Sequence, residues 1–305
     1  MRISAQKVAL GTSPGARPPA AVEVAPEGVL AAAAPGAGGA YVYAFAPLAA
    51  GVITPAIEGT NLHAPGDVSK AIRSALDDVS PRTRAVTLVL PDTLVRVFVL
   101  DFDSVPAKSS EAISIVRFRL RKSVPFDVEH AGVSYQVLSQ KQSDCKVLAA
   151  VIPGPVLSEY ESAVRDAGYE PGAVLSSSLA ALESVNGLEA VMAANLSTHS
   201  ITTSIANGQD LLLYRTLDLP SDSSQCLYEI QRSIAVAAAY YEDKLGARPM
   251  RLHYAGIAPA TEFARAIANP DLTVVDWVPR PESGALTTLP QTSYAGVAGA
   301  LAGAR

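Results

Sequence analysis

The chain has 305 residues, of which 49% are hydrophobic, and its formal net charge at pH 7 is −5. This length suits two lobes rather than one small core, and the hydrophobic content is ample for a sizeable interior. The net negative charge argues against a general nucleic-acid-binding protein, because phosphate contacts need a concentrated positive surface. Cys145 and Cys226 lie far apart and form no Cys-x-x-Cys motif, which is typical of small core side chains in a reducing compartment.

The sequence predicts a globular protein of the cytoplasm with no membrane span of its own. Residues 1–7 carry no long apolar run of the kind found in a secretory signal. Residues 28–57 contain no charged residue, but they are rich in Ala and Gly and are interrupted by Pro35, Pro47 and Pro55. Prolines hinder the internal hydrogen bonding that a span needs, so we expect short strands there, and a transmembrane helix is the weaker alternative.

Residues 1–81 predict several short strands followed by a helix. Apolar runs separated by Gly-rich and Pro-rich connections predict strands at residues 8–10, 20–24, 29–33 and 41–45. With Asp67 as the predicted N-cap, an apolar stripe at helical spacing then predicts a helix that ends at Ser80 and Pro81.

The clearest periodicity lies in residues 84–138. The pattern predicts a helix that begins near Ser109 and strands at residues 85–90, 94–102 and 133–138. The strand at 85–90 is closed by a Pro91-Asp92 turn. Arg117 and Arg121 lie near the end of the helix, where cations complement the helix dipole.

The remainder of the chain repeats the order of strands and helix seen near the N-terminus. Further strands are predicted at residues 146–152, 190–195, 200–205, 211–215, 252–255 and 273–278, with Asn207-Gly208 as a hairpin turn. Helices are predicted to start at Pro155, at the capping pair Ser223-Ser224 and at Pro259, and over residues 294–301. A lobe boundary is expected within residues 172–178. The repeated order predicts two similarly built lobes.

The helix that ends on Pro125-Phe126, the acidic turn at residues 127–129 and the strand after it resemble the PilM family of type IV pilus assembly proteins. That family is related to the cell-division protein FtsA and to the cytoplasmic part of the secretion protein GspL. The resemblance implies an α/β, actin-like (RNase H-like) two-lobed fold with a small α/β subdomain inserted in the first lobe. It implies a first lobe at residues 1–172, with the subdomain at about 84–152, and a second lobe at 173–305 closed by the C-terminal helix.

The same resemblance implies a nucleotide cleft formed by Gly11, Thr12, Ser13, Asn195, Ser197, Thr198 and Gly256. The family places an Asp just before the first phosphate loop, where this chain has Leu10, and Asn195 brings no charge to the second loop. Carboxylates are the main protein ligands of a metal ion that carries a triphosphate. We therefore expect a degenerate cleft, a pseudo-ATPase, in which ATP with Mg binds weakly if at all.

Two patterns that resemble catalytic or metal-binding motifs are predicted to be structural. Gly11-Thr12-Ser13-Pro14-Gly15 matches the Gly-x-Ser-x-Gly nucleophile elbow, but Pro14 has no N–H to donate to an oxyanion, so the stretch is predicted to be a loop. The four histidines are scattered without metal-ligand spacing. The sequence predicts no catalytic residue and no metal site.

The resemblance implies a cytoplasmic protein that binds the cytoplasmic tail of a PilN-like inner-membrane partner, alongside other pilus assembly proteins. It would be peripheral to the inner membrane through that partner. The groove between the first lobe and the subdomain is the expected tail site, with Arg117 and Arg121 as candidate contacts to acidic tail residues. The alternative role of these two arginines is to be solvated and to complement the helix dipole. Two other functions stay open: an active actin-like ATPase, and a GspL-like part of a type II secretion platform.

Overall fold

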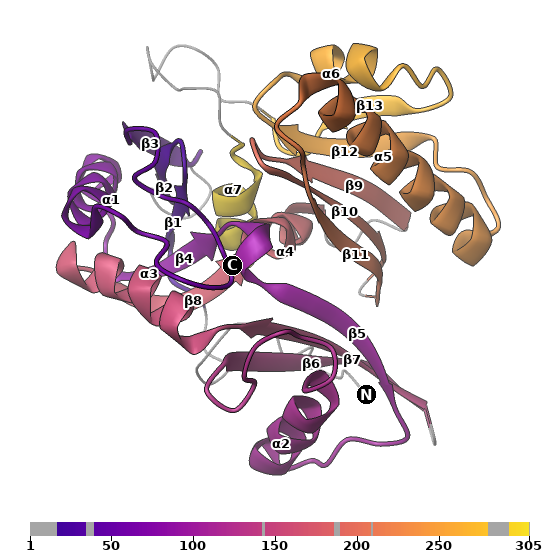
Figure 1. Cartoon of the computed structure of the whole chain (residues 1–305), viewed down its shortest axis with the longest axis horizontal. Coiled ribbons are helices and arrows are strands. Elements are labelled where there is room, and N and C mark those ends of the chain that lie inside the picture. The colour runs from indigo at the N-terminus through magenta and orange to yellow at the C-terminus, as the bar shows by residue number, and fades with distance from the viewer. Residues whose placement is uncertain are drawn as a thin grey trace.

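The first lobe is built around a five-stranded sheet whose strand order is β3-β2-β1-β4-β8 (Figure 1). The computed structural model describes residues 17–34, 40–141, 144–185, 190–208, 210–279 and 293–304. The strands of this sheet are β1 Ala20–Ala25, β2 Gly28–Ala33, β3 Val42–Pro47, β4 Ala85–Leu90 and β8 Glu170–Ser176. In β1, β2 and β4 apolar residues follow one another without alternation, as is typical of strands that are buried on both faces.

Helices cover the two faces of the first sheet. One face packs against α1 (Pro65–Val79) and α3 (Gly154–Asp166), which supply Ile72, Leu76 and Tyr160 to the core. The other face packs against the C-terminal helix α7 (Ala295–Ala302). The sequence led us to expect that α7 closes the second lobe, and this is wrong. Its Ala and Gly residues allow close approach, since a Cβ at Gly299 would lie 2.0 Å from the carbonyl oxygen of Ala180.

The second lobe repeats the plan of the first. Its sheet has the order β11-β10-β9-β12-β13, made of β9 Ala190–Leu196, β10 Ser200–Asn207, β11 Asp210–Asp218, β12 Arg251–Gly256 and β13 Thr273–Asp276. In each sheet the first three strands in sequence form an antiparallel meander. The fourth strand pairs parallel with the first strand, and the fifth pairs parallel with the fourth. One face packs against α5 (Ser223–Leu245) and α6 (Ala260–Ile267).

A third sheet forms a small subdomain between β4 and α3. Its order is β5-β7-β6, with β5 Arg96–Phe102, β6 Gly132–Lys141 and β7 Asp144–Ile152. The helix α2 (Ser109–Leu120) covers one face through Val116 and Leu120. The opposite face, which includes Leu148, joins the core of the first lobe. The predicted insertion into the first lobe is therefore present.

The local predictions differ from the structure at helix starts and at one boundary. The N-cap of α5 is Asp222, whose carboxylate accepts hydrogen bonds from the N–H groups of Ser224 and Gln225 at 3.1 and 2.9 Å. The helix α1 begins at Pro65, so Asp67 lies in its first turn and is not its cap. Between residues 172 and 178, where only a lobe boundary was predicted, the chain forms the end of β8 and the start of α4 (Ser177–Leu182).

The uncharged stretch at residues 28–57 contains strands, as expected. Its described part forms β2, β3 and the segment after β3. None of the described helices is long and apolar enough to cross a membrane. The predicted strand at residues 8–10 lies outside the described residues.

Candidate functional site

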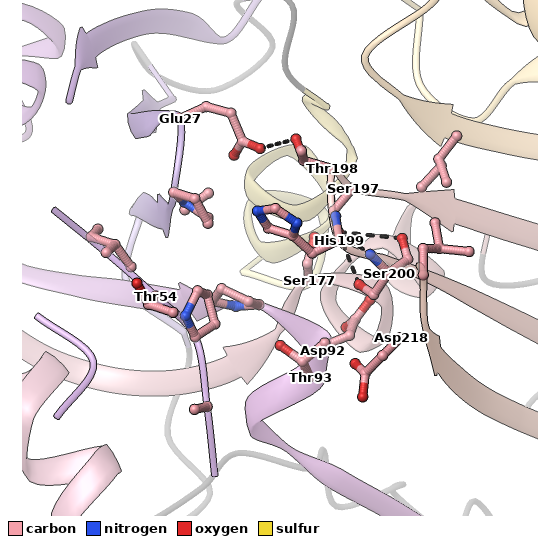
Figure 2. A pocket seen from close by; sticks show the side chains of 18 of the residues that line it. Glu27, Thr54, Asp92, Thr93, Ser177, Ser197, Thr198, His199, Ser200 and Asp218 are labelled. Carbon is pink, nitrogen blue, oxygen red and sulfur yellow. Dashed lines mark hydrogen bonds between the residues drawn. The ribbon is translucent and has the colours of Figure 1, made fainter. Parts of the chain in front are cut away.

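A cleft of about 920 Å³ lies between the two lobes and extends to the junction with the subdomain. The second lobe contributes the turn after β9, and the first lobe contributes the turn after β1 and the start of α4. The cleft extends along residues 48–57, which follow β3, and reaches Thr93 and Arg96 where the subdomain begins. Figure 2 shows polar side chains from both lobes converging on it.

Two hairpin turns face each other across this cleft. They are residues 26–27 between β1 and β2, and residues 197–199 between β9 and β10, which occupy equivalent places in the two sheets. A side chain of each turn joins the other directly, because Thr198 Oγ1 donates a hydrogen bond to Glu27 Oε1 (Figure 2). The turn of the second lobe is closed on itself, since the N–H of Ser200 donates to Ser197 Oγ at 3.1 Å.

Asp92 connects the two lobes through a single buried carboxylate. It opens the short 3-10 turn Asp92–Leu94 directly after β4, and only 5% of it is exposed. Its Oδ1 accepts hydrogen bonds from the N–H of Ser178 and from the Tyr214 hydroxyl, both at 2.9 Å. Its Oδ2 accepts from Ser178 Oγ and, at 3.4 Å, from Asn195 Nδ2. Tyr214 and Asn195 both belong to the second sheet.

Asn195 and Tyr214 extend this network to the serines at the end of β8 and the start of α4. Asn195 Nδ2 also lies 3.1 Å from the hydroxyl oxygens of Ser177 and Ser178. The Tyr214 hydroxyl lies 3.1 Å from Ser176 Oγ. Burial, with the charge of Asp92 as the second cause, raises the pKa of Tyr214 well above its ordinary value, so this side chain stays a hydrogen-bond donor.

Glu23 is a second acidic side chain beside this network. Its Oε2 is buried and has no hydrogen-bond partner among the described residues, while a Cβ added at Gly296 in α7 would lie 2.5 Å from that atom. Burial raises the pKa of Glu23 to about 7; a hydrogen bond with Ser177 opposes the rise, and the charges of Asp92 and Glu27 add to it. The carboxyl group therefore gains or loses a proton near neutral pH.

The structure brings only part of the predicted nucleotide cleft together. Asn195, Ser197 and Thr198 line the cleft. Gly256 lines a smaller cavity beside Tyr254, whose hydroxyl oxygen would be 2.2 Å from a Cβ at that position. Residues 11–13 lie outside the described residues. The equivalent of the turn at 197–199 is the turn at 26–27, because these two turns follow the first strand of their sheets.

The sequence interpretation missed the acidic residues of the site. It found no carboxylate for the cleft, whereas the structure lines the cleft with Glu23, Glu27, Asp92 and Asp218, so that reason for expecting a degenerate site is wrong. The repeated order of strands was the sequence signal that could have located these carboxylates. Aligning the two hairpins on their first strands, β1 and β9, would have placed residues 23–27 opposite residues 195–199. Within the described residues, no group of three or more His, Cys, Asp and Glu side chains is arranged to hold a metal ion.

The structure places Arg117 and Arg121 away from the cleft. Both lie on or just after α2, and neither lines the cleft. The guanidinium of Arg117 donates to the carbonyl oxygens of Val128 and Ala131, so it holds the loop before β6 in place. Arg121 forms an ion pair with Glu129. The arginine that does line the cleft is Arg96.

Replacing Asp92 with Ala should weaken the connection between the lobes. The substitution leaves Tyr214, Ser178 and Asn195 without their shared acceptor, and we expect a loss of about 3 kcal/mol in the free energy of unfolding. Urea unfolding measures the loss, and small-angle scattering should show a larger radius of gyration. The matched control is Asp218→Ala, since Asp218 is an exposed carboxylate of the same cleft. Equal losses for the two variants would contradict the role of Asp92.

The contribution of Glu23 to the free energy of unfolding should fall as the pH rises from about 4.5 to about 7. In this window the folded state keeps the proton of Glu23 while the unfolded state, whose glutamate pKa is near 4.5, releases it. Glu23→Gln should remove this contribution, on the order of 2 kcal/mol between pH 5 and 8 relative to wild type. Urea unfolding at several pH values measures it, with the exposed Glu58→Gln as control. Parallel curves for Glu23→Gln and wild type would contradict the assignment.

Comparison with known proteins gives matches in structure. No protein-family model matches the chain, and no curated protein matches its sequence. A solved PilM–PilN type IV pilus biogenesis complex contains a chain with a TM-score of 0.75 and 17% identity, covering 95% of this chain and 100% of that one. The cytoplasmic domain of EpsL, an inner-membrane component of the type II secretion system of Vibrio cholerae, has a TM-score of 0.51 and 12% identity, covering 86% and 89%. The chain therefore has the two-lobed actin-like ATPase fold, and in structure it resembles the type IV pilus protein PilM.

Proposed function

We propose that this chain is a PilM-like component of type IV pilus assembly that binds the cytoplasmic tail of a PilN-like inner-membrane protein. In this proposal the protein is cytoplasmic and is brought to the inner membrane by that partner and by other assembly proteins. The observation that carries the proposal is the shape of the cleft, which continues from between the lobes to the junction with the subdomain. The likeness to a chain of a PilM–PilN complex, over nearly the whole length, supports it.

The outer part of the cleft has the chemistry of a peptide site. Its wall at residues 48–57 presents Leu48, Pro55 and Ile57. The 3-10 turn Asp92–Leu94 adds Thr93, and the start of β5 adds Arg96. An extended tail gains affinity when its apolar side chains enter such a wall and its main chain finds hydrogen-bond partners. Arg96 adds a cation that suits an acidic residue of the tail, since a guanidinium pairs with a carboxylate through two parallel hydrogen bonds.

The inner part of the cleft does not fit a metal-bound triphosphate. Pro26 has no N–H group that could donate a hydrogen bond to a phosphate. Glu27 of the same turn already accepts a hydrogen bond from Thr198 of the opposite turn. Both carboxylate oxygens of Asp92 already accept hydrogen bonds from the protein. Four carboxylates line this space, and like charges repel strongly where water is partly excluded. These observations support a pseudo-ATPase and make an active ATPase the second candidate, in which the same carboxylates would instead serve a metal ion.

The protein should neither hydrolyse ATP nor bind Mg-ATP with a dissociation constant below about 1 mM, an affinity of about 4 kcal/mol. Calorimetry with Mg-ATP and a phosphate-release assay measure this. Glu27→Ser should leave the result unchanged, because Asp92 and Glu23 still occupy the inner cleft. Submicromolar binding, or turnover that Glu23→Gln abolishes, would establish the active ATPase in place of the proposal.

Arg96→Glu and Ile57→Asp should each weaken binding of a synthetic partner tail by at least about tenfold, the cost of losing one good interface contact. The Arg96 change reverses the charge that faces the tail, and the Ile57 change puts a carboxylate in the apolar wall. Titration calorimetry with the wild type and both variants provides the measurement.

Arg121→Glu is the matched control for the tail titration. It makes the same charge change just after α2, outside the cleft, and tail affinity should stay unchanged. Thermal unfolding of each variant checks that the fold is intact. The proposed tail site is wrong if Arg121→Glu abolishes binding while Arg96→Glu does not. It is also wrong if the folded wild type does not bind the tail of its partner.

A further inference from the structure

The outward face of α2 carries two large apolar side chains that lie outside the hydrophobic core, and the Phe118 ring has the Arg121 guanidinium 5.8 Å from its centroid. Phe118 is 70% exposed and Ile115 is 39% exposed, and they lie about one turn apart on the same side of the helix. The opposite side of α2 buries Ala112, Val116 and Leu120 in the subdomain core. An aromatic side chain left this far in water contributes little to folding, so its exposure points to a contact outside the chain.

The segment that carries this face is strongly basic in an acidic protein. Residues 108–122 contain five cations and one acid, whereas the whole chain has a net charge of −5. The one acid, Glu111, is paired with Lys108 at 3.1 Å. Arg119 and Lys122, which flank Phe118 on the exposed side, form no ion pair among the described residues.

The two acidic residues in the turn after α2 contact other side chains. Glu129 forms an ion pair with Arg121, and Asp127 lies 2.6 Å from the His130 ring nitrogen. Neither of them pairs with Arg119 or Lys122. An anionic surface opposite this face would therefore be electrostatically complementary to these two cations.

We infer that the outward face of α2, defined by Ile115, Phe118, Arg119 and Lys122, contacts an anionic lipid membrane surface. The phosphates of the lipids attract the two cations, and the aromatic ring of Phe118 enters the boundary between headgroups and acyl chains. Figure 1 shows α2 at the outer end of the subdomain, away from the second sheet, where a plane can approach it. A face of four side chains is far smaller than the roughly 800 Å² per partner of a stable protein interface, which favours lipid over protein.

This contact goes beyond the proposed function, because it does not involve the cleft or the tail of a partner. One weak contact gives only marginal, reversible membrane binding, and stable recruitment takes two signals. The α2 face supplies one signal from this chain itself, and a bound membrane protein supplies another. It also orients the subdomain toward the membrane.

The test measures cosedimentation of the full chain, without any partner, with vesicles of phosphatidylcholine alone or mixed with phosphatidylglycerol. The protein should bind the anionic vesicles and not the neutral ones. Raising the salt from about 0.1 M to about 1 M should release it, since the screening length falls from about 10 Å to about 3 Å. Equal binding to both vesicle types, or none to either, would overturn the inference.

Variants locate the contact on the surface. Arg119→Glu/Lys122→Glu should lower the partition coefficient for anionic vesicles by at least about 30-fold, and Phe118→Ser should lower it by roughly tenfold. The matched controls are Lys70→Glu/Lys244→Glu, with the same change in charge, and Met250→Ser at a side chain that is 73% exposed. Equal losses for the controls would overturn the assignment to α2.

Two further measurements separate the lipid contact from tail binding and from self-association. Tail binding in the cleft should stay unchanged in the α2 variants, so failure of the tail site and failure of the lipid contact are distinguishable. Sedimentation without lipid should show the wild type to have the same oligomeric state as Phe118→Ser. A wild-type dimer that this variant dissolves would assign the face to a second copy of the chain and overturn the lipid contact.

Discussion

The arrangement of the two lobes depends on the carboxylate of Asp92. This side chain is almost fully buried and gathers donors from α4, β9 and β11, so the first lobe holds two strands of the second through one group. A buried carboxylate is tolerated only when its oxygens are well bonded, and here both are. Since Asp92 lies on the floor of the cleft, the same bonds determine how far the cleft is open and which parts of it remain for a ligand.

The inner and outer parts of the cleft follow from this constraint. The inner part is acidic, and hydrogen bonds between the protein's own side chains connect its two sides. Asp92 accepts several of these bonds, and Glu27 accepts one from Thr198. The outer part, along residues 48–57, has an apolar wall and Arg96. The fold places the two turns opposite each other, and the side chains on them determine the chemistry of the cleft, because function resides in side chains and not in the fold.

The sequence predicts local structure here far better than it predicts long-range contacts. The apolar stripe of α1 and the Asn207-Gly208 turn are local signals, and they predicted the right elements. In the sequence, Asp92 can be identified only as a turn residue after a strand. Its role between the lobes could not be predicted, because its hydrogen-bond partners are 86 to 122 positions away in the chain. The resemblance implied a first phosphate loop at residues 11–13, which lie outside the described residues, whereas the turn at 26–27 faces the second lobe through Glu27 and Thr198. The helix α7 is apolar all round, so no periodicity shows which sheet it joins.

The packing of α7 on the first sheet has a consequence for how the protein is made. The strands of that sheet leave the ribosome early, but the face containing Ala21, Leu30 and Val89 packs against residues 294–301. The whole second lobe is synthesised in between, so this apolar face is not fully buried until residues 294–301 have been made. Domains made in sequence can fold one after another, whereas this topology makes the nascent first lobe depend on a helix that follows the second lobe. Until that helix is synthesised, the exposed face is a natural target for a chaperone.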